Sequence, residues 1–317
     1  MSLDAGVALA AAGYGYLAAL SNDGGVAALS SRAVGVRNYL ALSGYDVPDT
    51  MITAGDYGNV GVRTINGVWN DQVTVTAQQF YGAWSGSTEK WVVGLSQDFV
   101  SGVIARQTNL QPWASFGWSS PGLSVWQDSS RDTYVGVAND LLRFAPDAGA
   151  PVSDALGVNG SVRGIWSAPG FPVTALTDSP LGPIIRSRDA GNNWDFTDLT
   201  SLTPAHYDSI HGAALGDGGF EVWIAGEKGN LLHRLYDGGY EVLTMGTQDL
   251  FAVFVEADRT WAVGDKGTVL LRTDDAGWSS ITVASGFPLR GVWAAPGGDG
   301  VWVIGLGNTV LSKIPAR

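Results

Sequence analysis

A short phrase that recurs along the chain limits the folds available to this sequence more than any other feature. Residues 261–272 read WAVGDKGTVLLR, residues 223–234 read WIAGEKGNLLHR, and residues 302–311 read WVIGLGNTVL. Each copy is a run of strand-favouring residues, a glycine-rich corner that tolerates positive φ, and a second such run. This pattern is typical of a tight β-hairpin.

Weaker copies of the phrase extend the repeat over the whole chain. Aligning them makes eight positions equivalent, spaced by 35 to 50 residues: Leu20, Gly55, Gly94, Gly136, Leu176, Gly226, Gly264 and Gly305. A period of about 40 residues is typical of the four-stranded blade of a propeller. We therefore predict one all-β domain over residues 1–317, a β-propeller with three to four antiparallel strands per blade. Eight blades are expected, and seven are the alternative if the first and last units share a blade.

Composition narrows the possible partners. The chain has 18 basic and 30 acidic residues, a formal net charge of −12, so nucleic acid would be repelled over most of the surface. The absence of cysteine excludes disulfides and zinc–thiolate sites. The three histidines do not have the spacing of a helical zinc pair, and no nucleophile elbow occurs. We predict no metal and no cofactor.

The apolar N-terminal segment 5–20 imitates a signal peptide, but no basic residue precedes it. We interpret it as the inner strand and hairpin of a first blade. No stretch has the length and flanks of a transmembrane helix. We expect an extracytoplasmic or secreted protein, with any natural leader preceding this sequence.

One turn carries a known family signature. Residues 187–194 read SRDAGNNW. They resemble the Asp-box, or BNR repeat, of sialidase-type propellers and of photosystem II assembly factors of the YCF48 type. The phrase at 261–272 also looks like the YCF48-type repeat, and tectonin-type lectins are a looser similarity. The resemblance implies a structural box, in which Ser187, Asp189, Gly191 and Trp194 stabilise a corner away from any active site.

Tryptophans recur with the period of the repeat. Trp84, Trp126, Trp166 and Trp293 share one position on the expected inner strands. Residues that recur in this way are expected to be buried between adjacent blades. The alternative is a platform on which sugar rings stack.

Three arginines form the main candidate binding cluster. Aligned on the inner-strand phrase, Arg37, Arg163 and Arg290 occupy one position, where the other units carry Tyr81, Leu123, Ile210 and Phe251. The start of each inner strand lies at one end of the central channel, so three guanidinium groups there would bind a carboxylate or another small anion. The alternative is that each arginine pairs with a nearby acid and closes the channel.

The arginines also allow an enzymatic alternative. Sialidases, which this chain resembles at the Asp-box, surround a substrate carboxylate with three arginines. Their chemistry also needs paired carboxyl groups, yet none of the five glutamates lies in a recognisable catalytic phrase. We assign no catalytic residue and keep a glycoside hydrolase, and a carbohydrate-binding lectin, as alternatives.

The function we predict is a non-enzymatic scaffold that presents one face and the central channel to a protein or glycan partner. The hairpin loops at that face supply the other candidate binding residues, Asp56, Glu227, Lys228, Asp265 and Lys266. The first and last units are too short for an outer strand, so we also expect a bare sheet edge available to another chain.

Overall fold

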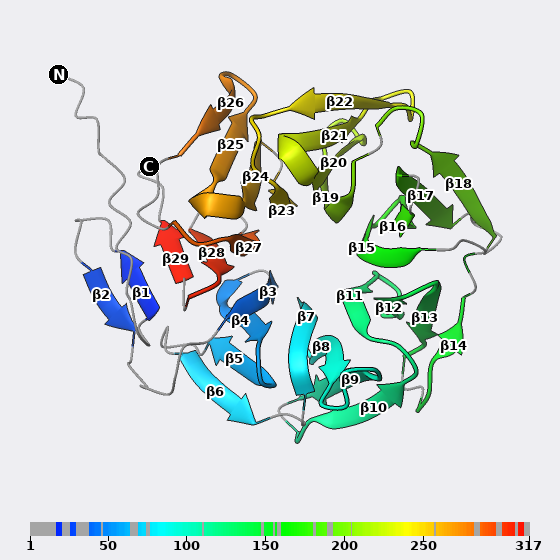
Figure 1. The fold of residues 1–317 in the computed structure, drawn as a ribbon, viewed down its shortest axis with the longest axis vertical. Helices are drawn as coiled ribbons and strands as arrows, with labels where there is room; N and C mark the ends of the chain where they lie inside the picture. The colour runs from blue at the N-terminus through cyan, green and yellow to red at the C-terminus, as the bar shows by residue number, and fades with distance from the viewer. Residues whose placement is uncertain are drawn as a thin grey trace.

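The computed structural model describes residues 17–20, 26–29, 38–45, 47–63, 69–73, 77–109, 111–146, 149–154, 156, 160–179, 182–188, 193–203, 205–256, 258–281, 286–295, 300–307 and 310–313. Nearly all of its secondary structure is antiparallel β-sheet arranged radially around a central channel (Figure 1). The predicted all-β propeller fold is therefore confirmed.

Six four-stranded blades follow one another along the chain. The first three contain β3 (Tyr39–Tyr45), β4 (Val47–Gly55), β5 (Asn59–Arg63) and β6 (Trp69–Val73); β7 (Ala77–Ser85), β8 (Glu89–Ser96), β9 (Gly102–Thr108) and β10 (Ala114–Trp118); and β11 (Gly122–Gln127), β12 (Thr133–Val137), β13 (Asp140–Phe144) and β14 (Val152–Ser153). The next three contain β15 (Ser161–Ala168), β16 (Phe171–Ser179), β17 (Gly182–Arg188) and β18 (Trp194–Asp198); β19 (Tyr207–Ala214), β20 (Phe220–Gly226), β21 (Asn230–Arg234) and β22 (Tyr240–Thr244); and β23 (Leu250–Val255), β24 (Arg259–Gly264), β25 (Val269–Thr273) and β26 (Gly277–Ser280).

A three-stranded sheet completes the ring. It contains β27 (Leu289–Ala294), β28 (Val301–Gly305) and β29 (Val310–Lys313), and β27 lies between the inner strands β23 and β3. Two short 3-10 turns, η1 (Glu227–Gly229) and η2 (Asp265–Gly267), form hairpin corners. No helix in the described part of the chain is long and apolar enough to cross a membrane.

The predicted number of blades, eight with seven as the alternative, is wrong, because the described residues form six blades of four strands. The first repeat unit is the source of the error. Its β1 (Leu17–Leu20) and β2 (Val26–Leu29) form a separate two-stranded sheet, and β1 lies beside β29 at the outside of the ring (Figure 1). The expected contact of a bare sheet edge with another chain stays a prediction.

The glycines of the repeated corner have two different roles. The second glycine has the expected positive φ, as at Gly229 (φ 72°) and Gly267 (φ 73°). The first glycine, which ends the second strand, is needed for another reason. In five inner strands the residue paired with this glycine is large and apolar, as in Leu250 opposite Gly264 and Phe80 opposite Gly94. The backbone at Gly264 is extended, with φ −166°, so positive φ is not the reason for glycine there. A Cβ added to Gly264 would lie 1.9 Å from the carbonyl oxygen of Asp249, so close backbone approach requires the glycine.

A hydrogen bond accompanies this close contact. The residue after the glycine donates a hydrogen bond from its N–H to the carbonyl oxygen of the residue before the inner strand. The N–H of Asp265 lies 2.8 Å from the Asp249 carbonyl oxygen, and that of Glu227 lies 2.9 Å from the His206 carbonyl oxygen. The hairpin corner therefore lies at the end of the blade where the inner strand begins. We call this end the mouth face.

The tryptophans divide into two groups. Those on the second strands are buried: Trp91, Trp223, Trp261 and Trp302. On the inner strands Trp166 and Trp293 are also buried, but Trp84 and Trp126 are only partly buried and line the channel. The prediction that all four inner-strand tryptophans are nearly fully buried is thus wrong for two of them.

Replacing Gly264 with alanine should lower the free energy of unfolding by about 1–3 kcal/mol, since the new Cβ collides with a backbone carbonyl that cannot move away. Gly216 is a matched control, because an added Cβ there meets no atom within 4 Å. Gly216→Ala should change stability by less than about 0.5 kcal/mol in the same urea titration. Equal losses in the two variants would contradict the close-approach explanation.

Trp166→Ala should lower the free energy of unfolding by about 3–5 kcal/mol, as expected for truncating a core aromatic residue. The same substitution at Trp84, which occupies the equivalent position but is open to the channel, should cost clearly less. Denaturant unfolding followed by circular dichroism measures both. A loss at Trp84 as large as that at Trp166 would show that channel exposure does not separate these positions.

Candidate functional site

A cavity of about 1270 Å³ occupies the centre of the ring. Its wall is formed by the inner strands β3, β7, β11, β15, β19, β23 and β27, which face one another around the centre (Figure 1). No group of three or more His, Cys, Asp or Glu residues suited to a metal ion occurs among the described residues.

Each inner strand has a β-bulge at the same place, just after its start. The bulge leaves one residue unpaired with the second strand, and all seven such residues line the cavity. Bulges often turn a side chain toward a functional site in this way. We call these residues the mouth ring: Leu40, Tyr81, Leu123, Arg163, Asp208, Phe251 and Arg290.

The mouth ring corrects the predicted arginine cluster. Arg163 and Arg290 are where the sequence alignment placed them, at equivalent positions facing one cavity. Arg37 lies outside the described residues, and the equivalent position on β3 is Leu40. On β19 the position belongs to Asp208, two residues before the expected Ile210.

One recurring signal identifies the correct register. A large buried apolar residue stands immediately before the bulge on most inner strands, as Leu250 does before Phe251, Leu289 before Arg290 and Tyr207 before Asp208. An alignment anchored on that residue would have found Asp208.

The two arginines of the mouth ring have different surroundings. Arg163 Nε lies 3.6 Å from an Asp178 carboxylate oxygen, and Asp178 also contacts His206 Nδ1 at 2.5 Å. The hydrogen bond to Asp178 raises the pKa of His206. Arg290 makes no ion pair with a described residue and places its guanidinium 3.7 Å from the centre of the Phe251 ring. Burial lowers the pKa of Arg290.

Asp56 belongs to a polar network at the mouth. Its carboxylate accepts hydrogen bonds from Asn38 Nδ2 at 2.5 Å and from Gln79 Nε2 at 2.8 Å, while Tyr81 donates to Gln79 Oε1 at 2.8 Å. Desolvation, followed by the charge of Asp56, raises the pKa of Tyr81. Asp56 is buried, so it contributes to the shape of the mouth more than to its accessible surface.

Glu227, Lys228, Asp265 and Lys266 lie in η1 and η2 at the mouth face. Both lysines are exposed and have left-handed backbone conformations, with φ 57° at Lys228 and 51° at Lys266. The N–H of Lys228 donates to Asp249 Oδ1 at 2.9 Å, which links this corner to the next blade.

The same left-handed conformation recurs at other hairpin tips of the mouth face. Tyr57 has φ 56° and Phe99 has φ 61°, and their side chains are 73% and 65% exposed. The Asp98 carboxylate accepts hydrogen bonds from the N–H groups of Val100 and Ser101, which stabilises the turn around Phe99. A non-glycine residue with a left-handed backbone conformation destabilises the folded protein by about 1–3 kcal/mol, and it persists where the surrounding structure requires it.

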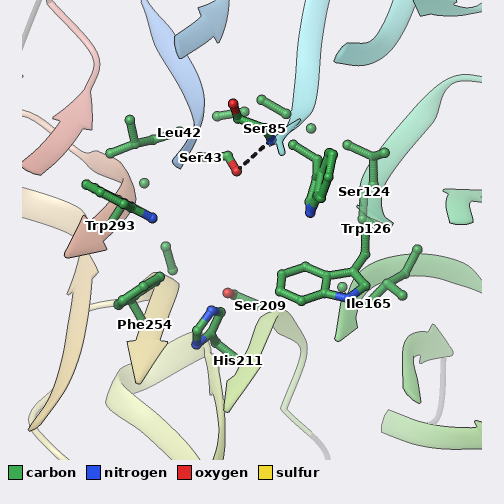
Figure 2. A pocket seen from close by; sticks show the side chains of 18 of the residues that line it. Leu42, Ser43, Ser85, Ser124, Trp126, Ile165, Ser209, His211, Phe254 and Trp293 are labelled. Carbon is green, nitrogen blue, oxygen red and sulfur yellow. Dashed lines mark hydrogen bonds between the residues drawn. The ribbon is translucent and has the colours of Figure 1, made fainter. Parts of the chain in front are cut away.

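An aromatic belt lines the cavity deeper in the channel than the mouth ring. Its members lie three residues after the mouth-ring residue on five of the inner strands: Trp84, Trp126, His211, Phe254 and Trp293. Figure 2 shows Trp126, His211, Phe254 and Trp293 around the wall. The His211 ring stacks on Phe254 with centroids 4.2 Å apart, and Phe254 is 6.4 Å from Trp293.

Side chains of the belt region also bond to the neighbouring blade. Ser43 Oγ accepts from the Ser85 N–H at 3.0 Å (Figure 2), and His211 Nδ1 accepts from the Val255 N–H at 3.0 Å. These bonds satisfy edge N–H groups of inner strands that have no sheet partner on the channel side. Since Nδ1 accepts, the proton of neutral His211 is on Nε2. Burial lowers the pKa of His211 to about 3.

Comparisons with known proteins identify the architecture. No protein-family model matches the sequence, and no curated protein matches it. A structure described as YCF48 bound to D1 peptide has a TM-score of 0.66 at 12% identity, with 89% of this chain and 94% of that chain covered. That structure and this chain share the β-propeller fold. The WD40 β-propeller domain of Doa1 has a TM-score of 0.68 at 13% identity, with 88% and 94% covered. At these identities the similarity concerns the fold.

His211 should make stability depend on pH. Its folded pKa of about 3 is below the ordinary value near 6.5, so the unfolded chain binds more protons between these values. The contribution of neutral His211 is fully present above about pH 6.5 and is lost as the pH falls toward 3. Relative to His211→Gln, the wild type should lose up to about 1.4 kcal/mol per pH unit in this window. Parallel pH profiles in chemical denaturation would contradict this.

Proposed function

We propose that this protein is a non-enzymatic propeller scaffold that binds a protein partner on its mouth face. The observation that carries the proposal is the pair Tyr57 and Phe99, two large side chains exposed on adjacent blades by strained left-handed backbone. Glycine would adopt that backbone without strain, so the side chains themselves have a use. Exposed aromatic residues are preferred anchors in protein interfaces.

Charge on the same face adds specificity to this surface. Lys228 and Lys266 occupy the equivalent hairpin tips of two other blades, each next to an acid, Glu227 or Asp265. A partner segment that crosses the mouth would meet aromatic side chains on one side and mixed charges on the other. Loops that differ in chemistry on a repeated scaffold are the usual location of recognition. The YCF48 structure with a bound D1 peptide has the same fold, so the architecture is compatible with protein recognition.

A glycan partner and glycoside hydrolysis are the alternatives to this proposal. Trp84 and Trp126, which line the cavity, are the feature that favours a sugar ligand. They lie in the channel and not on the hairpin tips, so variants at the two places separate the alternatives.

We propose a structural role for the Asp-box. Asp189 and Gly191 lie outside the described residues, while Ser187 is on β17 and Trp194 on β18. Support comes from the related turn at Asp237, whose carboxylate accepts the Gly239 N–H at 2.9 Å. Local bonding of this kind accounts for an aspartate without any catalytic role.

We also propose an extracytoplasmic or secreted location. Immunodetection in separated culture medium, envelope and cytoplasmic fractions of the source cells tests it. Detection only in the cytoplasmic fraction would overturn it.

The binding proposal is tested with peptides selected by phage display on the immobilised protein and with a glycan array probed in parallel. Selected peptides should bind the wild type in calorimetry and lose about tenfold or more in affinity with Tyr57→Ser or Phe99→Ser, as for interface anchors. Tyr236 is the matched control: it is 96% exposed in the turn between β21 and β22, at the opposite end of the blade. Tyr236→Ser should leave affinity unchanged.

Two results would overturn the proposal. One is peptide affinity that is insensitive to both tip substitutions. The other is glycan binding, or hydrolysis of a fluorogenic sialoside, that persists in Tyr57→Ser and Phe99→Ser but is lost in Trp126→Ala.

A further inference from the structure

Three consecutive inner strands, β19, β23 and β27, give one sector of the channel a distinctive mouth. Their mouth-ring residues are Asp208, Phe251 and Arg290, in that order around the ring. The aromatic residue thus lies between an acid and a base. Neither the Asp208 carboxylate nor the Arg290 guanidinium has a hydrogen bond or an ion pair within 4 Å to the described part of the chain.

The other charged groups of the cavity wall have partners. Arg163 pairs with Asp178, and at the opposite end of the channel Arg131 lies 3.8 Å from Glu89. Asp56 and Asp128 accept hydrogen bonds from amide groups, for example the N–H of Ser130 at 2.8 Å for Asp128. Partly buried charges are normally paired in this way. Asp208 and Arg290 are therefore the two exceptions in this wall.

Burial acts on both exceptions in the direction that disfavours charge. It raises the pKa of Asp208 and lowers the pKa of Arg290, while the charges of Arg163 on Asp208, and of Asp208 on Arg290, act in the opposite direction. Arg290 Nε is buried without an acceptor. Each group would be stabilised by a counter-charge brought by a ligand.

The wall beneath these three residues is uncharged. Three residues deeper on the same strands lie His211, Phe254 and Trp293, which adjoin one another around the wall (Figure 2). Leu42 and Ser43 of β3 line the cavity beside Trp293. Because His211 is neutral above about pH 4, this region offers ring surfaces and neutral polar groups to a ligand.

We propose that this sector binds a small zwitterion, an α-amino acid with an aromatic or large aliphatic side chain. Its ammonium group contacts the Asp208 carboxylate, its carboxylate contacts the Arg290 guanidinium, and its side chain lies against His211, Phe254 and Trp293. A simple anion would leave Asp208 unpaired and a simple cation would leave Arg290 unpaired, whereas a zwitterion neutralises both. A short apolar peptide with both termini free carries the same chemistry and is the second source of such a ligand.

The test is calorimetry of the whole protein at neutral pH with phenylalanine, leucine and tryptophan, and with the dipeptide Phe-Leu as the peptide arm. N-acetylphenylalanine lacks the ammonium group and phenylalanine amide lacks the carboxylate. Each derivative should bind about 10- to 100-fold more weakly than phenylalanine, since each loses a charge-assisted hydrogen bond.

Two variants that each remove one charge assign the contacts. Asp208→Asn should weaken phenylalanine binding and abolish the preference over N-acetylphenylalanine, while keeping the preference over the amide. Arg290→Gln should do the reverse. Arg131→Gln, at the opposite end of the channel, is the matched control and should bind as the wild type does. Unchanged thermal unfolding shows that each variant is folded.

The proposal is overturned if the folded wild type binds none of the three amino acids and does not bind the dipeptide Phe-Leu. It is also overturned if the derivatives bind as tightly as phenylalanine, or if Asp208→Asn and Arg290→Gln leave the preferences intact. The site does not depend on the protein-binding proposal, because it involves none of the hairpin tips. Tyr57→Ser should leave phenylalanine affinity unchanged, so the two proposals succeed or fail separately.

Discussion

The close contact between the second-strand glycine and the start of the inner strand is the constraint on which the rest of this structure depends. A carbonyl group packs where a Cβ would otherwise be, 1.9 Å from the position of that atom at Gly264 and at Gly94. The next N–H then donates to the same carbonyl, as Asp265 does to Asp249. This contact fixes the register of the first two strands of the blade and places a bulge directly after it. The contact recurs at Gly55, Gly94, Gly226, Gly264 and Gly305, and it gives these five sheets the same geometry at the mouth face.

The bulge converts that constraint into a site. It turns one side chain per inner strand into the channel, and the backbone does so whether the residue is Leu40, Arg163 or Asp208. The next position is small on every inner strand, since neighbouring inner strands approach closely there; a Cβ on Gly164 would lie 2.8 Å from Ile210. Fold and function thus use different positions of the same strand. The mouth ring varies freely in chemistry because its side chains face the cavity and carry little of the packing.

The sequence predicts the parts of this molecule that repeat. The glycine phrase correctly indicates antiparallel hairpins in a propeller, and the inner-strand phrase correctly places Arg163 and Arg290 at one end of the channel. Prediction from the sequence fails where the copies of the repeat differ most from one another. Asp208 was missed because the alignment on the inner-strand phrase put Ile210 at this position, whereas the bulge of β19 lies two residues earlier, at Asp208. The blade number was wrong because apolar residues before Leu20 satisfy an inner-strand pattern, and pattern alone does not say which neighbour a strand contacts.

The separation of Asp208 from Arg290 follows from the same geometry that builds the ring. The bulge residues of alternate inner strands are kept apart by the strand between them, and here that strand places Phe251 in the gap. The Arg290 guanidinium, 3.7 Å from the Phe251 ring, gains a cation–π contact that competes with a direct ion pair. Two opposite charges are therefore held facing a cavity without neutralising each other. If Asp208 and Arg290 had a purely structural role, their unpaired charges would destabilise the folded protein. The arrangement is best explained by a ligand that pairs with both.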